Sequence, residues 1–160
     1  MEIITKTAKE TQKIAKILAK EIIKMPTMGK GALVLTLTGE LGAGKTTFTQ
    51  GFVAGLGIKE EVSSPTFLIM KKIELHKHLL KVKSAKLKVQ SKFKSLYHLD
   101  CYRLKNEKDL IDLDIKEIIE DRENIILIEW PEKIKKILPK NLIKISFEYK
   151  SLKERLINFQ

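Results

Sequence analysis

Apolar and polar positions alternate along the chain in two periods, one typical of helices and one typical of strands. Residues 32–38 form an apolar run that predicts a strand buried on both faces. A glycine-rich turn follows, and then a helical pattern with Phe48, Phe52 and Leu56 on one side. Near the start of the chain, residues 7–10 form a capping box that opens another predicted helix. The apolar face predicted for this first helix consists of Ile14, Ile17, Leu18, Ile22 and Met25.

The rest of the chain continues this alternation of strands and helices. The further predicted elements are a strand at Ile3 and Ile4, an extended segment over 62–67, strands over 96–104 and 124–128, helices over 107–120 and 132–138, and strands over 142–149 and 152–159. Such alternation is typical of an α/β fold with three layers, in which helices cover both faces of a mostly parallel sheet. Because no repeat and no long linker interrupts the pattern, we expect one domain over residues 1–160.

The positive charge of the chain is concentrated in one segment. The whole sequence has a net charge of +11, and residues 71–95 alone carry +8 through nine lysines and one acid. Apolar and polar residues alternate in this segment, which predicts a lysine-rich β-ribbon inserted into the fold. The alternative is an electrostatic contact with nucleic acid. A solvent-exposed ribbon is the simpler interpretation, because residues 71–95 contain only one phenylalanine, tyrosine or tryptophan ring for base stacking, that of Phe93.

Residues 39–46 match the phosphate-binding loop pattern G-x-x-x-x-G-K-[ST] at every fixed position. The pattern has the context it requires, since a predicted strand precedes it and a predicted helix follows. Glycines let backbone amides turn toward an anion, Lys45 can reach the β- and γ-phosphates, and the Thr46 hydroxyl can bind Mg²⁺. The loop therefore predicts a P-loop NTPase-like fold that binds a nucleoside triphosphate. The predicted binding residues are Gly39, Glu40, Leu41, Gly42, Ala43, Gly44, Lys45, Thr46 and Thr47.

Two acidic residues stand at the ends of predicted strands, Asp100 in one and Glu129 after the most apolar late strand. Because ligands bind beyond the carboxyl ends of parallel strands, we expect both acids on the same sheet edge as the loop. We assign Glu129, with Thr46, to Mg²⁺, and Asp100 to orienting the attacking water or holding a metal-bound water. The alternative for each acid is a helix cap or a pair with a lysine. The candidate catalytic residues are Lys45, Asp100 and Glu129.

The class of nucleotide enzyme is narrowed by what the sequence lacks. All eight glycines lie between residues 29 and 57, so the D-x-x-G switch of a GTPase cannot occur downstream. Small-molecule kinases usually place several arginines over the transferred phosphoryl group, and this chain has three arginines in total. These observations favour an ATPase over a small-molecule kinase. A regulatory binding module with negligible hydrolysis is the other interpretation.

Several further residues have both a functional and a structural interpretation. Thr66 could sense the γ-phosphate or the metal, and Trp130 could border the nucleotide pocket or lie in the core. We interpret His98 as a hydrogen-bonded structural residue and Cys101 as a small packing residue. The lone cysteine, the absence of a long apolar segment and the absence of a signal peptide predict a cytoplasmic protein without a membrane partner.

Four ordered motifs make the chain similar to a known family. They are the loop sequence GELGAGKTTF, Ser64–Phe67, Tyr97–Leu104 and Ile128–Glu132. Together they resemble the bacterial TsaE (YjeE) family, the ATPase of tRNA threonylcarbamoyladenosine synthesis. The resemblance implies ATP and Mg²⁺ as cofactors and TsaD and TsaB as partners, which attach threonylcarbamoyl to the adenosine beside the anticodon. It also implies an indirect link to tRNA, with ATP hydrolysis supporting repeated turnover of that complex.

The chain departs from the pattern of this family at two places. The family usually joins its Ser-Pro-Thr-Phe and His-x-Asp-x-Tyr-Arg motifs through a short turn, whereas this chain places the lysine-rich segment between them. In addition, Asp114 stands where the family commonly has glycine, which puts a local turn in question.

Overall fold

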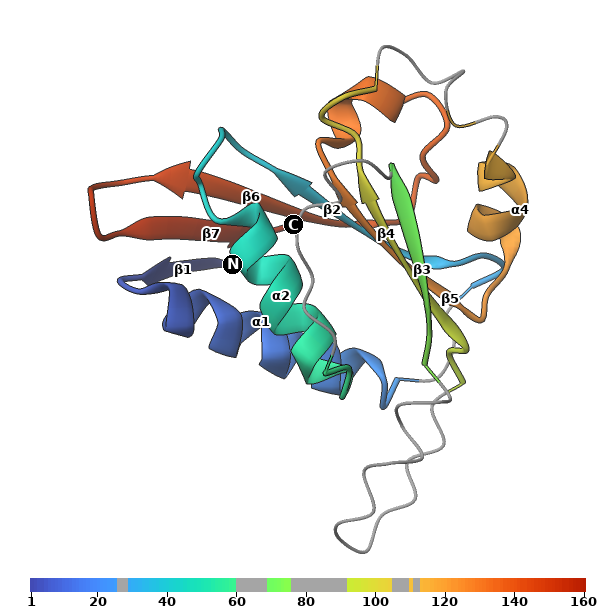
Figure 1. Cartoon of the computed structure of the whole chain (residues 1–160), viewed down its shortest axis with the longest axis horizontal. Helices are drawn as coiled ribbons and strands as arrows, with labels where there is room; N and C mark the ends of the chain where they lie inside the picture. Colours follow the sequence, from blue (N-terminus) through green and yellow to red (C-terminus); the bar gives the residue numbers. More distant parts are fainter. Residues whose placement is uncertain (26–28, 60–68, 76–91, 105–109, 111–112) are drawn as a thin grey trace, which may run out of the picture.

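The computed structural model describes residues 1–25, 29–59, 69–75, 92–104, 110 and 113–160. Within these ranges the chain forms a seven-stranded sheet with the order β1-β7-β6-β2-β5-β4-β3 (Figure 1). The strands are β1 (Glu2–Thr5), β2 (Leu33–Thr38), β3 (Met70–Glu74), β4 (Ser95–Asp100), β5 (Asn124–Glu129), β6 (Ile143–Tyr149) and β7 (Arg155–Phe159).

The four central strands of this sheet are parallel, and the outer ones are not. Strands β6, β2, β5 and β4 run in the same direction. The pairs β1·β7, β6·β7 and β3·β4 are antiparallel. The prediction of a parallel sheet therefore holds for its centre, while the sheet as a whole is mixed. One reason is local: only the short turn 150–154 joins β6 to β7, and a parallel connection needs a dozen or more residues.

Helices lie on both faces of the sheet, which gives the predicted three layers (Figure 1). Helices α1 (Ala8–Ile22) and α2 (Lys45–Gly55) pack on one face, in a core with Leu35 and Leu37 of β2. Helix α4 (Ile115–Glu120) and the 3₁₀ turn η2 (Pro131–Ile134) pack on the other face, in a core with Val34. Successive residues of β2 thus belong to opposite cores, as expected for a strand buried on both sides.

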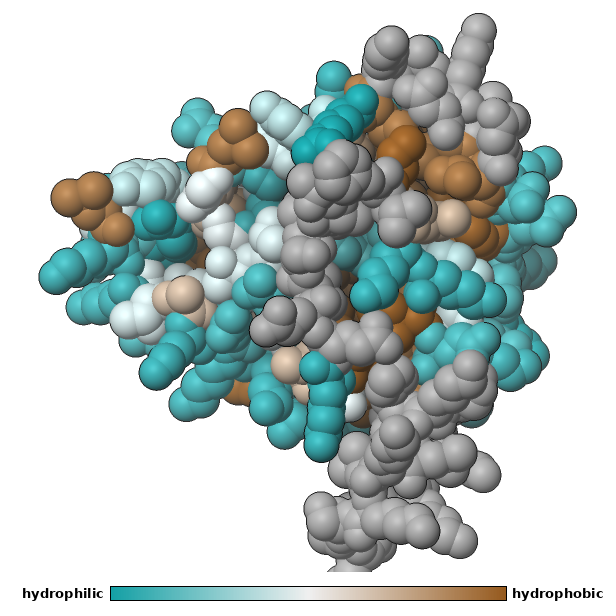
Figure 2. Space-filling view, viewed as in Figure 1, coloured by the Kyte–Doolittle hydropathy of each residue, from teal (hydrophilic) through white to brown (hydrophobic). Residues whose placement is uncertain are grey.

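Helix α1 begins as predicted, and the centre of its buried face is shifted from the predicted one. The Oγ1 atom of Thr7 accepts a hydrogen bond from the backbone nitrogen of Glu10, which is the predicted cap. Of the predicted apolar face, Ile22 is buried and Ile14 and Leu18 pack against the core, which confirms these three. The other two, Ile17 and Met25, are wrong, because these residues are 53% and 47% exposed. In the space-filling view, the solvent side of α1 is mainly hydrophilic (Figure 2). The most deeply buried residues of α1 are Thr11, Ala15, Ala19 and Ile22.

The reason for this shift is the close approach of α2. A methyl group added at Gly55 would lie 2.7 Å from the backbone oxygen of Lys16, and one at Gly51 would overlap the backbone of Gln12. Small residues are therefore required on both sides of the α1–α2 contact. A prediction from the helical period assigns large apolar residues to the core, and it does not identify alanines that pack against glycines of another helix.

Helix α2 agrees with its prediction at both ends. It begins at Lys45 and its buried residues include Phe48 and Phe52. Gly57, with φ of +83°, follows the last turn in the left-handed conformation expected after a helix. At the start of α4, Asp114 also has a positive φ, of +51°, so this position requires the conformation that glycine adopts without strain and aspartate tolerates. This explains why the family commonly has glycine there.

Some predicted elements fall on residues that the structure does not describe. The Ser-Pro-Thr-Phe motif with Thr66, and residues 76–91 of the predicted lysine-rich ribbon, lie outside the described residues. The base of that ribbon is described, and it is paired as an antiparallel ladder between β3 and β4. Of the helix predicted over 107–120, the described part contains α4. Among the described residues, no helix is long and apolar enough to cross a membrane.

Candidate active site

Residues 39–44, here called the glycine loop, connect the carboxyl end of β2 to the first residue of α2. Gly39, Gly42 and Gly44 have φ values of +137°, +75° and +110°. These are left-handed conformations that other residues adopt only with strain. A side chain at Gly39 would in addition overlap the backbone oxygen of Phe147 on β6. Both the backbone angles and the packing therefore explain why the loop carries glycines at these positions.

Lys45 folds back over the glycine loop. Its Nζ atom donates hydrogen bonds to the backbone oxygens of Gly39, at 2.6 Å, and Glu40, at 2.8 Å. The same atom lies 3.8 Å from the centre of the Trp130 ring. Burial lowers the pKa of the Lys45 ammonium, and the nearby carboxylates of Glu129, Glu132 and Asp100 oppose this shift. The structure therefore places one cation at the mouth of the loop, with several negative charges close to it.

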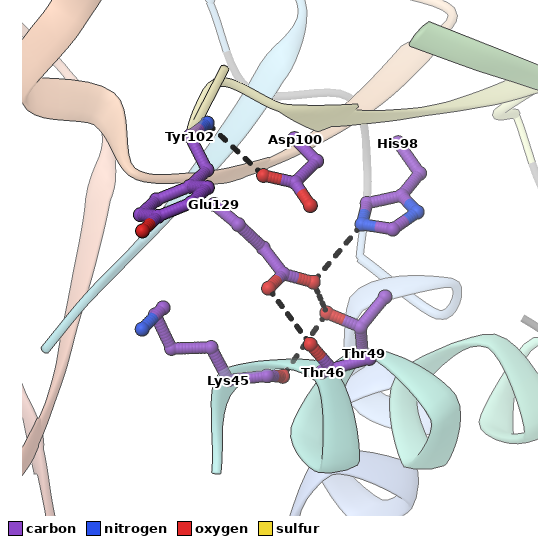
Figure 3. A network of polar contacts seen from close by, with 7 residues as sticks. All are labelled: Lys45, Thr46, Thr49, His98, Asp100, Tyr102 and Glu129. Atoms are coloured by element: carbon purple, nitrogen blue, oxygen red, sulfur yellow. Dashed lines mark hydrogen bonds and ion pairs between the residues drawn. The ribbon is translucent and has the colours of Figure 1, made fainter. Parts of the chain in front are cut away.

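Glu129 lies at the carboxyl end of β5 and faces the start of α2 (Figure 3). Its Oε2 atom accepts a hydrogen bond from Thr46 Oγ1 at 3.1 Å. Its Oε1 atom accepts one from Thr49 Oγ1 at 2.8 Å and lies 3.0 Å from His98 Nε2. The Glu129 side chain is only 1% exposed. A buried carboxylate is thus held between a helix and a neighbouring strand by three polar side chains.

Asp100 is the direct neighbour of Glu129 in the sheet, because the two residues are paired in the parallel register of β4 and β5. The structure therefore brings both predicted acids to the same edge as the glycine loop. Asp100 Oδ1 accepts a hydrogen bond from the backbone nitrogen of Tyr102 at 3.1 Å, which shapes the turn after β4. The catalytic and metal-binding roles of Asp100 and Glu129 stay predictions.

An aromatic pair and a thiol lie close to these acids. The ring centroids of Tyr102 and Trp130 are 5.0 Å apart, and Trp130 is partly buried with φ of +60°. Trp130 therefore lies beside Lys45 at the border of the site, and it also packs against one of the cores. Cys101 is fully buried, as its interpretation as a packing residue requires. Burial, with smaller effects of Asp100 and Glu132, raises the pKa of its thiol to about 12.

Thr49 and His98 are the two contacts of Glu129 that the sequence interpretation missed. Thr49 lies one helical turn after Lys45 and Thr46, so it shares the face of α2 that points at the sheet. His98 stands two positions before Asp100 in β4, and alternate residues of a strand point to the same face. Both periods were available from the sequence. The sequence did not show, however, that this face of α2 meets the face of the sheet that carries His98.

The site has the chemistry to bind a phosphate chain and a hard cation. Backbone amides, the start of an α-helix and Lys45 are groups that attract anions. Thr46 Oγ1 and Glu129 Oε2 are oxygen ligands of the kind that Mg²⁺ prefers, and they lie 3.1 Å apart. No cluster of three or more histidine, cysteine, aspartate or glutamate residues that could hold a metal occurs in the described part of the chain.

Comparisons with known proteins agree in one family. Residues 5–157 match the model of the family described as threonylcarbamoyl adenosine biosynthesis protein TsaE. The chain is 37% identical over 155 residues to a tRNA threonylcarbamoyladenosine biosynthesis protein TsaE of Bacillus subtilis, which covers 97% of this chain and 82% of the relative. It is also 37% identical over 113 residues to the protein of the same name from Treponema pallidum, which covers 71% of this chain and 70% of the relative.

A solved structure supports the same grouping. The fold is similar to the crystal structure of Bacillus subtilis YdiB, with a TM-score of 0.67 and 32% identity, over 99% of this chain and 83% of that one. The matched region includes the glycine loop, Asp100 and Glu129. The resemblance seen in the four motifs is thereby confirmed, and the chain belongs to the TsaE family of tRNA threonylcarbamoyladenosine biosynthesis proteins.

Proposed function

We propose that this chain binds ATP with Mg²⁺ at residues 39–47 and hydrolyses it in support of tRNA threonylcarbamoyladenosine formation. One observation carries the proposal. The Glu129 carboxylate at the end of β5 is hydrogen-bonded to the Thr46 hydroxyl at the start of α2, directly beside the glycine loop and Lys45. An acid at the end of one strand and a hydroxyl at the start of the helix that follows the neighbouring parallel strand, next to an anion-binding loop, are what nucleotide hydrolysis at a P-loop requires.

The glycine loop and Lys45 would bind the phosphates. The loop supplies backbone amides, and α2 adds the positive end of its dipole. In the structure, the ammonium group of Lys45 donates hydrogen bonds to the backbone oxygens of Gly39 and Glu40. Phosphate oxygens carry full negative charge and are stronger acceptors than these carbonyls. We therefore expect Lys45 to exchange part of its loop contacts for the β- and γ-phosphates.

Thr46 and Glu129 are the residues that would hold Mg²⁺. The donor set fits this ion, because Mg²⁺ is usually bound by one or two protein oxygens together with phosphate oxygens and waters. When bound, the ion would neutralise charge that develops on the phosphates. Asp100, the register partner of Glu129 at the same edge, would orient the attacking water by accepting its hydrogen bond.

The pathway and the partners come from the family. Relatives with 37% identity are named as tRNA threonylcarbamoyladenosine biosynthesis proteins. The motif resemblance adds TsaB and TsaD as the proteins that this ATPase would serve. The lone cysteine and the absence of a signal peptide add the cytoplasm as the place where it would do so. ATP hydrolysis would then be stimulated in the complex, and tRNA would be reached through the partners.

Phosphate release from ATP, measured with and without purified TsaB and TsaD, tests this proposal. We expect stimulated release in the wild type and a loss of about 1000-fold in Lys45→Ala and in Glu129→Gln, because each removes a charge at the reacting phosphates. Glu120→Gln makes the same chemical change on an exposed acid at the end of α4, beside Gly31 and so near the start of β2, away from the loop, and it is the matched control.

Three results would contradict the proposal in different ways. Wild-type binding of ATP without any stimulated release would favour a regulatory binding module. Transfer of phosphate to a small molecule would favour a kinase. Full release in both Lys45→Ala and Glu129→Gln would show that the site is elsewhere.

A further inference from the structure

The hydrogen bonds around Glu129 treat the two oxygens of its carboxylate differently (Figure 3). Oε1 is contacted by Thr49 Oγ1 at 2.8 Å and by His98 Nε2 at 3.0 Å. Oε2 is contacted by Thr46 Oγ1 at 3.1 Å. We propose that His98 and Thr49 are positioning residues that hold Oε1, so that Glu129 presents Oε2, with Thr46, to the divalent cation. This inference rests on the proposed function of the site.

Burial makes these contacts restrictive. The side chains of Thr49, His98 and Glu129 are 0%, 1% and 1% exposed. Water therefore does not replace a lost hydrogen bond at Oε1, and a buried carboxylate oxygen without a donor is unfavourable. With both donors in place, rotation of the carboxylate is restricted, and Oε2 stays on the side of Thr46.

The protons of the two donors are fixed by their partners. Glu129 accepts at Oε1, so the hydrogen of His98 lies on Nε2. The other ring nitrogen of His98, Nδ1, is buried and has no hydrogen-bond partner within the described residues. Within the described residues, the hydrogen bond of the His98 ring is therefore the one from Nε2 to the carboxylate of Glu129. A buried histidine used in this way fits a role in orienting that carboxylate.

Thr49 makes a second contact, with the backbone oxygen of Lys45 at 3.1 Å. A hydroxyl has a single hydrogen, and both of these partners are acceptors. The shorter distance to Glu129 Oε1 shows where the hydrogen is mainly directed. His98 then supplies the second donor to this oxygen, from a different element of the fold. The two residues together fix the carboxylate relative to both α2 and β4.

A merely structural role for this network would lower stability and leave the use of the cation intact, so the test measures that use separately. Trp130 is the single tryptophan of the chain and touches Lys45, so its fluorescence can report nucleotide binding. The dissociation constant of ADP is measured in EDTA and in excess MgCl₂, with calorimetry as a second method. The ratio of the two constants is the magnesium gain, and thermal melting confirms that each variant is folded.

We expect the magnesium gain to fall about tenfold in His98→Leu and in Thr49→Val, while the constant in EDTA changes less than about twofold. His98→Gln keeps an N–H donor close to the position of Nε2, and Thr49→Ser keeps the hydroxyl, so both should restore most of the gain. Thr11→Val is the matched control. It also removes a buried threonine hydroxyl, which is bonded to Thr5 Oγ1 on the α1 side of the fold.

The possible results separate this inference from the proposed function. If His98→Leu and Thr49→Val keep the wild-type gain while Glu129→Gln loses it, the positioning role is wrong and the proposed function stands. An equal loss in Thr11→Val would also overturn the inference, since stability alone would then explain the effect. If wild-type protein binds no ADP, or binds it without regard to magnesium, the proposed function fails and the inference fails with it. Should His98→Leu not fold, the isosteric Thr49→Val decides.

Discussion

Strand β5 buries a polar residue at each of its ends, but these residues make different contacts. At the amino ends, Ser95 and Asn124 are register partners, and Asn124 Nδ2 donates a hydrogen bond to the backbone oxygen of Ile118 at 3.1 Å. At the carboxyl ends the register partners are Asp100 and Glu129, and Glu129 is bonded to other side chains. The amide of Asn124 hydrogen-bonds to a backbone group, whereas the carboxylate of Glu129 is held by side chains of other elements.

This difference helps to distinguish buried polar groups with a functional role from those that only stabilise the fold. Asn124 satisfies a backbone acceptor that would otherwise be unpaired at the end of α4, so its burial is explained by folding alone. The burial of Glu129 has no such explanation, since a charge is costly to bury and aspartate and glutamate are rarely enclosed without a partner. Three experiments test the contrast.

The largest expected effect concerns Cys101, which follows Asp100 at the carboxyl end. Burial raises the pKa of its thiol from 9.0 to about 12, so the folded protein keeps the thiol protonated at a pH where the unfolded chain loses the proton. At about pH 8, below both pKa values, we expect alkylation of the native protein by iodoacetamide to be roughly 1000-fold slower than alkylation in denaturant, because the thiolate fraction is lower by that factor. Mass spectrometry measures this directly, because the chain has one cysteine.

The raised pKa of Cys101 also makes the stability of the fold depend on pH. Because the unfolded thiol ionises first, stability should fall as the pH rises above about 9 and continue to fall toward 12. Similar alkylation rates in the native and the denatured protein would mean that the carboxyl end is open on this side, and the contrast between the two ends would be weaker.

The next effect is on hydrolysis. Asp100→Asn removes a charge but keeps an oxygen that can accept the hydrogen bond from the Tyr102 backbone, so the turn after β4 should stay intact. We expect stimulated phosphate release to fall roughly 100-fold, with ADP affinity within a few fold of wild type. Release at the wild-type rate would remove Asp100 from the reaction and leave Glu129 as the candidate catalytic acid.

The smallest effect is at the amino end. Asn124→Ala leaves the backbone oxygen of Ile118 without its buried donor, and we expect a loss of about 1 to 3 kcal/mol in the free energy of unfolding. Urea denaturation measures this loss. Phosphate release per folded molecule should stay within about twofold of wild type. A variant with wild-type stability and impaired release would reverse the contrast between the two ends.

Much of this arrangement could be predicted because it depends on local rules. The cap at Thr7, the doubly buried strand β2 and the glycine after α2 follow from neighbouring residues in the sequence. The position of Asp100 beside Glu129 follows from a general property of parallel sheets. These features need no knowledge of how distant elements pack.

The features that were missed depend on packing between distant elements. The rotation of α1 is set by Gly51 and Gly55 on α2, so Ile17 is exposed although its spacing indicates the core. The antiparallel strand β7 is set by the short turn that follows β6, which determines its direction. The contact of His98 with Glu129 requires both the register of β4 with β5 and the orientation of the side chains at that edge.

The main-chain contact of α1 with α2 has a mechanical consequence. At Gly51 and Gly55 no side chain separates the two helices, so the backbone of α1 lies directly against α2. A shift of α2 along its axis would bring larger side chains into collision with this backbone. Thr46 and Thr49 are carried by this helix and are therefore fixed to the N-terminal part of the chain. We therefore expect phosphate binding to change the conformation of the glycine loop and of Lys45, and not to shift α2 along its axis.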